Sequence, residues 1–146
     1  MKRILSDGER SVLRFDEGEE VITGVIKFCN EAQIKAGSFI AVGACQQVIL
    51  SYYDLERKVY EDHDIKKEME IVCVHGNIGT VNGSVIIHAH GSFSDRQLEV
   101  KGGHIKKLII SATAEVILTK LSGEIQRLLD EKTGLRLMTP SQEGAD

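Results

Sequence analysis

The sequence of 146 residues contains no tryptophan, one proline and only three cysteines. Cys29, Cys45 and Cys73 are far apart and form no Cys-x-x-Cys pair, which argues against a disulfide framework or a thiolate zinc site. We therefore expect them to be small buried residues of a cytoplasmic protein in a reducing environment. No apolar run approaches the roughly 18 residues that a membrane span needs, and no apolar signal core follows the first residues. The protein is predicted to be neither secreted nor membrane-spanning.

Basic residues are fewer than acidic ones, with 18 Lys and Arg against 22 Asp and Glu and a net charge of −4. Binding to a phosphate backbone draws its affinity from basic residues, so this balance disfavours direct DNA binding. The nearest basic group, Lys101, Lys106 and Lys107, is interpreted as a solvated strand end. The sequence has no phosphate loop, dinucleotide fingerprint or nucleophile elbow, which disfavours the commoner enzyme classes.

The hydrophobic content of 42% and the length are sufficient for one domain with a substantial core. No internal repeat or linker interrupts residues 1–140, which we expect to form that single domain. The residues after Pro140, 141–146, are polar and predicted to form a disordered tail.

Apolar periodicity predicts an α+β fold with a mostly antiparallel sheet. A first strand is expected at 9–15, and an amphipathic helix from Val21 to about Ala36, ended by Gly37. The stretch 38–54 fits one long bent strand or two strands divided near Gly43, and we favour two. Further strands are expected at 59–65, 70–80, 85–93, 98–107 and 108–121, with a hairpin at Asn82-Gly83. A short C-terminal helix is predicted at 124–132, followed by an edge strand at 135–138.

Three of the five histidines converge on one predicted hairpin. Side chains alternate along a strand, so His88 and His90 project from the same face, roughly 6.6 Å apart along the backbone. A hairpin after Asp95 would return His104 alongside them. Three imidazoles with an open fourth position suit a metal that binds a water or a small ligand. The alternative is that each histidine is simply packed or hydrogen-bonded, which is how His63 and His75, outside the cluster, are interpreted.

Other polar residues are weaker candidates. Arg14 lies between apolar residues and is a candidate ligand-binding residue that would clamp an anion, although a surface ion pair with Glu17 or Glu19 is the simpler explanation. An enzyme would also need a proton carrier near the metal. Glu68, Glu70 and Asp95 are candidates because their segments adjoin the histidine strands.

Four motifs follow one another in a distinctive order: Gly37–Ala44, Glu70–Val72 with Gly76–Ile78, His88–Asp95, and Gly102–His104. Together they resemble the plant and prokaryote conserved (PPC) domain, in particular its stand-alone archaeal and bacterial members. The resemblance extends from Leu13 to Leu121 and implies an α+β fold built on a strongly bent antiparallel sheet, and assembly as a homotrimer. In plants the domain is joined to an AT-hook that enters the minor groove of DNA. This sequence has no AT-hook, so the resemblance gives little support for a DNA-binding role.

The fold also resembles that of acetolactate decarboxylase, whose zinc is held by a His-x-His pair and a later histidine. His88, His90 and His104 match this order, which implies a divalent metal, with zinc as the first candidate. We therefore expect a metal-binding homotrimer that binds a small molecule or a partner at these histidines. The alternatives are a DNA-binding regulatory module and a zinc-dependent enzyme. The pattern favours a binding role, and any enzyme would be a lyase like the decarboxylase, or a hydrolase.

Overall fold

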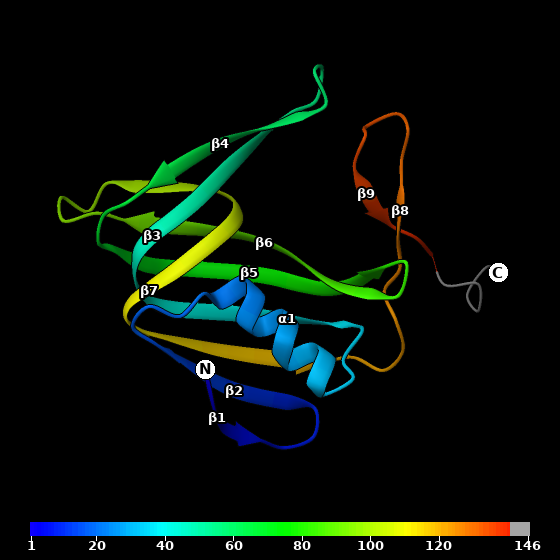
Figure 1. The fold of residues 1–146 in the computed structure, drawn as a ribbon, viewed down its shortest axis with the longest axis horizontal. Helices are drawn as coiled ribbons and strands as arrows, with labels where there is room; N and C mark the ends of the chain where they lie inside the picture. Colours follow the sequence, from blue (N-terminus) through cyan, green and yellow to red (C-terminus); the bar gives the residue numbers. More distant parts are fainter. Residues whose placement is uncertain (141–146) are drawn as a thin grey trace.

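The computed structural model describes residues 1–140, and the predicted disordered tail at 141–146 lies outside the described residues. These residues form a mostly antiparallel β-sheet with one helix, as predicted (Figure 1). The seven-stranded sheet has the order β1-β2-β7-β6-β5-β3-β4, and a two-stranded sheet pairs β8 with β9. The bounds are β1 (Lys2–Ser6), β2 (Arg10–Asp16), α1 (Val21–Glu31), β3 (Gly37–Asp54), β4 (Val59–Ile65), β5 (Met69–Val81), β6 (Ser84–Ser94), β7 (Val100–Lys120), β8 (Arg127–Leu129) and β9 (Arg136–Met138).

Two long strands bend the sheet until it closes on itself. β3 has 18 residues and β7 has 21, and the two pair with each other in addition to their other neighbours. The favoured division of 38–54 into two strands is therefore wrong, because Gly43 lies in an irregularity of the ladder where β3 bends without ending. The predicted strands 98–107 and 108–121 are likewise one continuous strand, β7.

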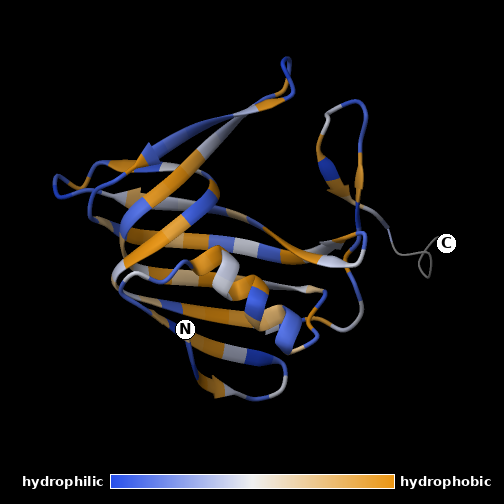
Figure 2. Ribbon diagram, in the orientation of Figure 1, coloured by the Kyte–Doolittle hydropathy of each residue, from blue (hydrophilic) through white to orange (hydrophobic). Residues whose placement is uncertain are grey.

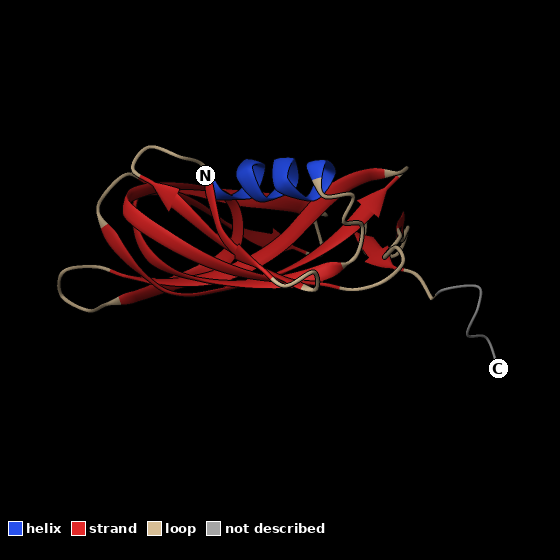
Figure 3. Ribbon diagram, turned by 90° about the horizontal axis from the view of Figure 1, so that it is seen from below, coloured by secondary structure: helices blue, strands red, loops and turns tan. Residues whose placement is uncertain are grey.

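The helix α1 covers one face of the bent sheet (Figure 3). Its N-cap is Glu20, whose carboxylate accepts hydrogen bonds from the backbone N–H groups of Ile22 and Thr23 and also from that of Leu108 on β7. It ends at Glu31, with Ala32 as its C-cap, several residues before the predicted end. Its apolar face packs with the inward side chains of the strands, which alternate with polar residues along the ribbon (Figure 2). The largest fully buried side chains are Phe15, Phe39, Phe93, Leu13, Ile78, Leu108, Ile110, Leu118, Val21, Val25, Val48 and Val74.

The predicted C-terminal helix at 124–132 is wrong, because tertiary contacts extend this segment. The Thr80 N–H donates to the Ile125 carbonyl at 2.8 Å, and the Ile125 N–H donates to the Lys35 carbonyl at 3.2 Å. These bonds replace the helical ones, and β8 follows directly. Leu128 and Leu129, which suggested an apolar helix face, are both more than half exposed. The edge strand predicted at 135–138 is observed as β9, and no helix within residues 1–140 is long and apolar enough to cross a membrane.

Candidate metal centre

The sheet brings the three predicted histidines together. His88 and His90 lie two residues apart on β6, and His90 is the direct register partner of His104 on β7. The ring centroids are 5.1 Å apart for His88 and His90, and 5.3 Å for each of these with His104. One ligand atom from each ring lies within 4.8 Å of those of the other two. The clustering expected from the sequence is therefore present in the fold.

A tight turn after β6 sets the register that places His104. The Asp95 carboxylate accepts hydrogen bonds from the backbone N–H groups of Gln97 and Glu99, and the Lys67 ammonium donates to it at 2.9 Å. These bonds hold the pKa of Asp95 below its ordinary value, the Lys67 bond having the largest effect. Asp95 therefore stabilises the turn of the hairpin. Beyond this turn β7 pairs with β6, which places His104 opposite His90.

Burial keeps two of the imidazoles in the form that binds metal. It lowers the pKa of His104 to about 4, with smaller contributions from His88 and His90. It also lowers the pKa of His88, aided by the charge of Arg127. Both rings are therefore neutral at pH 7, as metal ligation requires.

The donor set fits a zinc ion. His104 Nδ1 is buried and has no hydrogen-bond partner within residues 1–140, which is costly for a ring nitrogen that no ion or ligand contacts. His88, His90 and His104 would hold the ion, because one ligand atom from each ring lies within 4.8 Å of those of the other two and imidazole nitrogen is a common zinc ligand. Three imidazole ligands leave at least one position for a water or a small ligand.

The other candidates lie elsewhere. Arg14 on β2 is half exposed, and its Nε donates to the Asp16 carboxylate at 2.9 Å, so its ion-pair partner is Asp16 instead of Glu17 or Glu19. Its role as a ligand-binding residue stays a prediction. Glu68, Glu70 and Asp95 line a separate cavity with residues of β3 and β7, and none of the three lines the cavity beside the histidines.

Sequence reasoning missed Arg127, which lines a cavity with His88 and His104. This cavity has a volume of about 310 Å³ and lies between the sheet and the β8–β9 hairpin. The hairpin is anchored because the Tyr53 hydroxyl donates to the Thr133 carbonyl at 2.7 Å. Arg127 lies within the segment 124–132, where a helix was predicted, and no local pattern marked it as a site residue. The other lining residues are Tyr60, Ile86, Ile87, Gly134, Leu135, Arg136 and Leu137.

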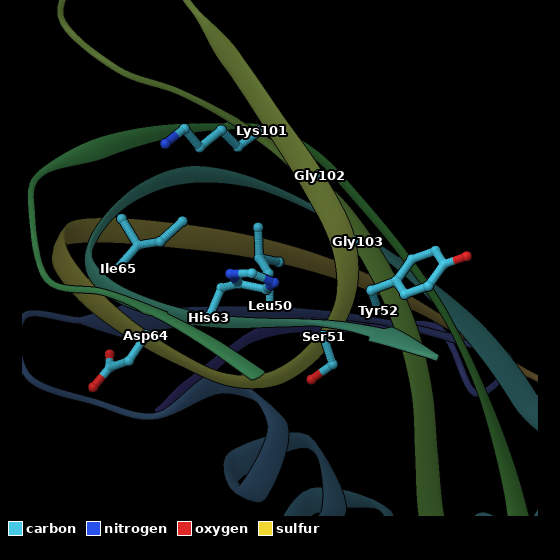
Figure 4. Close-up of a pocket in the computed structure, with 9 residues that line it drawn as sticks. All are labelled: Leu50, Ser51, Tyr52, His63, Asp64, Ile65, Lys101, Gly102 and Gly103. Atoms are coloured by element: carbon cyan, nitrogen blue, oxygen red, sulfur yellow. The ribbon is translucent and has the colours of Figure 1, made fainter. Parts of the chain in front are cut away.

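Another cavity, of about 510 Å³, is lined by Gly102 and Gly103 of β7 (Figure 4). It is lined by residues of β3, β4 and β7, including His63, Ile65 and Lys101. His63 is therefore separate from the histidine cluster. His75 is the register partner of His90 on β5, yet it is not part of the three-histidine group.

Comparison with known proteins identifies close structural relatives. A family model described as the Plants and Prokaryotes Conserved (PCC) domain matches residues 3–122. A metal-containing protein from Archaeoglobus fulgidus is 31% identical, with a TM-score of 0.85 over 96% of this chain and 100% of that one. A plant- and prokaryote-conserved protein from Pyrococcus horikoshii is 27% identical, with a TM-score of 0.85 over 95% and 99% of the two chains. No curated protein matches the sequence.

More distant structures share the fold. A protein from Bacteroides thetaiotaomicron described as a candidate DNA-binding protein is 24% identical, with a TM-score of 0.89 over 92% of this chain and 94% of that one. Acetolactate decarboxylase from Bacillus subtilis is 15% identical, with a TM-score of 0.54 over 80% of this chain and 55% of the enzyme. The predicted likeness to the decarboxylase fold is thereby confirmed. At 15% identity the likeness concerns the fold alone, and the enzyme's activity is not inferred for this chain.

Proposed function

The chain belongs to the Plants and Prokaryotes Conserved domain family, as its motifs predicted, and within this family we propose that it is a zinc-binding protein that takes a small molecule at a three-histidine site. His88, His90 and His104 would hold the ion. The observation that carries the proposal is their mutual approach within 4.8 Å, with a buried, unpartnered nitrogen on His104. The metal-containing relative from Archaeoglobus fulgidus, 31% identical, supports it.

Elemental analysis of protein purified without a metal-affinity tag tests this proposal. We expect about one zinc ion per chain in the wild type and less than about a tenth of that in a His88→Ala/His90→Ala variant, because a single imidazole does not retain zinc through purification. The matched control is His63→Ala/His75→Ala, which removes two histidines outside the cluster and should keep its zinc. A wild type without metal, or equal metal in both double variants, would contradict the proposal.

A zinc-dependent lyase is the second candidate, because a zinc ion with an open position can polarise a carbonyl group. Such a reaction needs a group that carries a proton close to the metal. Within residues 1–140, no Asp or Glu lines the cavity beside the histidines. This absence favours a binding role over catalysis.

DNA binding is the remaining alternative. The candidate DNA-binding protein from Bacteroides thetaiotaomicron shares this fold at 24% identity, which supports the architecture alone. The net charge of −4 opposes affinity for a phosphate backbone. Retention on a DNA column that decreases steeply with salt would favour this alternative over the small-molecule role.

We also propose that the chain assembles as a homotrimer, through an apolar patch on the outer face of the sheet. The patch consists of Ile40 and Val42 on β3, Val72 on β5 and Ile117 on β7, each between 44% and 52% exposed. Ile40 and Ile117 are direct register partners, so their side chains lie side by side. Apolar side chains exposed together on neighbouring strands mark a contact surface.

A charge placed in this patch should dissociate the assembly. We expect light scattering after size-exclusion chromatography to give the mass of three chains for the wild type and of one chain for Ile40→Glu/Ile117→Glu. Assembly of the variant would bury two unpaired carboxylates per subunit against apolar surface, which is costly. Leu128→Glu is the control, because Leu128 is 57% exposed on the separate β8–β9 hairpin. A monomeric wild type, or a trimer that survives the double substitution, would contradict this assembly.

A further inference from the structure

Arg127 carries a buried charge with no acidic partner among the described residues. Only 7% of the residue is exposed, and no carboxylate in residues 1–140 forms an ion pair with it. Its Nη1 donates to the Arg136 carbonyl at 3.0 Å, and its Nη2 donates to Asn77 Oδ1 at 2.6 Å. Both acceptors are neutral, and its Nε is buried without a partner. A buried charge is costly unless an opposite charge meets it, so this arrangement indicates an anion from outside the chain.

The contacts of Arg127 hold it beside the proposed metal ligands. Asn77, which accepts its Nη2 bond, is the register partner of His88. The Arg136 carbonyl, on the other side, belongs to β9, so both strands of the C-terminal hairpin fix the guanidinium. Arg127, His88 and His104 line the same cavity of about 310 Å³. An ion on the histidines and the Arg127 guanidinium would therefore both place positive charge at this cavity, which Arg136 also lines.

The remaining walls distinguish between kinds of anion. Most of the lining side chains besides these three residues are apolar, which suits a ligand with a hydrocarbon part better than a bare phosphate. The planar guanidinium can donate hydrogen bonds to one oxygen of a carboxylate group. The other oxygen of the same group can bind zinc, for which carboxylate oxygen is a common ligand. The apolar lining residues are Ile86, Ile87, Leu135 and Leu137.

We propose that this cavity binds a small organic monocarboxylate, whose carboxylate group lies between the three-histidine metal site and Arg127. The inference rests on the proposed function, because the ion supplies the second positive charge. Arg127 is a specificity-determining residue in this assignment. It selects anions over neutral molecules of the same shape, while the histidines hold the ion.

Calorimetric titration of the zinc-loaded full chain with butanoate tests the assignment, alongside butanamide and inorganic phosphate. Butanoate should bind the wild type, and Arg127→Gln should weaken this binding by at least about tenfold, since a charge-assisted hydrogen bond is lost. Butanamide should bind more weakly than butanoate and be insensitive to the substitution. Arg10→Gln is the matched control, because Arg10 is exposed on β2 and paired with Asp7.

Zinc content and thermal unfolding are measured on every variant, so that a folding defect is recognised. If Arg127→Gln does not fold, Arg127→Lys replaces it. That variant keeps the charge and loses the planar pair of donors, and we expect it to bind butanoate with intermediate affinity. Titration of the cobalt-substituted protein gives an independent readout, because an anion that enters the coordination shell changes the visible spectrum.

The outcomes separate this inference from the proposed function. Zinc retained in Arg127→Gln together with lost butanoate binding supports it. If the wild type and Arg127→Gln both retain zinc and bind butanoate with equal affinity, or if neither binds it, the inference is overturned and the proposed metal site is unaffected. Tighter binding of phosphate than of butanoate overturns the carboxylate assignment, and loss of binding in Arg14→Gln alone overturns the assignment to Arg127. A wild type that holds no metal overturns both proposals.

Discussion

Removing the metal with a chelator is expected to lower the melting temperature of the wild-type protein by roughly 10 °C. A ligand that binds only the folded state at a concentration a thousand times its dissociation constant stabilises it by about 4 kcal/mol. For a chain of this size, each kcal/mol corresponds to about 2–4 °C. The ion would join β6 to β7 through His90 and His104, at the end of the pairing between these strands. Loss of the ion should therefore lower the melting temperature of the whole domain, which circular dichroism measures.

The His104→Ala variant separates metal loss from other effects of the chelator. This variant should already melt near the temperature of the chelated wild type, and the chelator should not lower it further. His63→Ala is the control, because His63 lines the other cavity and should leave the chelator response intact. An equal chelator response in His104→Ala and the wild type would mean that the metal binds elsewhere.

The histidine cluster was predictable because it depends on local rules. The alternation of side chains along a strand places His88 and His90 on one face, and a short hairpin determines where His104 returns. These rules act within 17 residues of chain, and the structure agrees with them. Metal ligation itself requires an ion and stays a proposal.

The misjudged parts of the fold depend on contacts that are distant in sequence. The first strand, β1, was not predicted because all of its residues are exposed and show no apolar alternation. The helix expected at 124–132 had the right spacing of apolar residues. The backbone of this segment is instead bonded to Lys35 and Thr80, far away in the sequence.

Arg127 was missed for the same reason. Its burial results from the β8–β9 hairpin folding back against β5, where Asn77 accepts its hydrogen bond. A single arginine in a charged segment gives no local signal of such a contact. A site completed from a separate segment can be recognised only once that segment has been placed, whereas a site within one hairpin can be read from spacing.

Gly43→Ala is expected to destabilise the protein by about 3 kcal/mol or more, because β3 passes very close to β7 at this residue. A Cβ atom there would lie 2.2 Å from the Thr113 carbonyl oxygen and 2.7 Å from Ala114 Cα. Both are backbone atoms that cannot rotate away, and the φ angle of +146° is itself unfavourable for alanine. Relief would require the two long strands to separate where they cross.

Gly83→Ala provides a control at a glycine with a positive φ angle but no close contact. Gly83 has a φ angle of +78° in the turn between β5 and β6, and a Cβ atom there would meet nothing within 4 Å. Its replacement should cost only about 1 kcal/mol, from the left-handed backbone alone. Denaturant unfolding measures both variants, and equal losses would show that the contact with Thr113 does not matter. The pairing of β3 with β7 continues from Gly43 to Ser51 and His104, so Gly43→Ala should also reduce zinc retention, whereas Gly83→Ala should not.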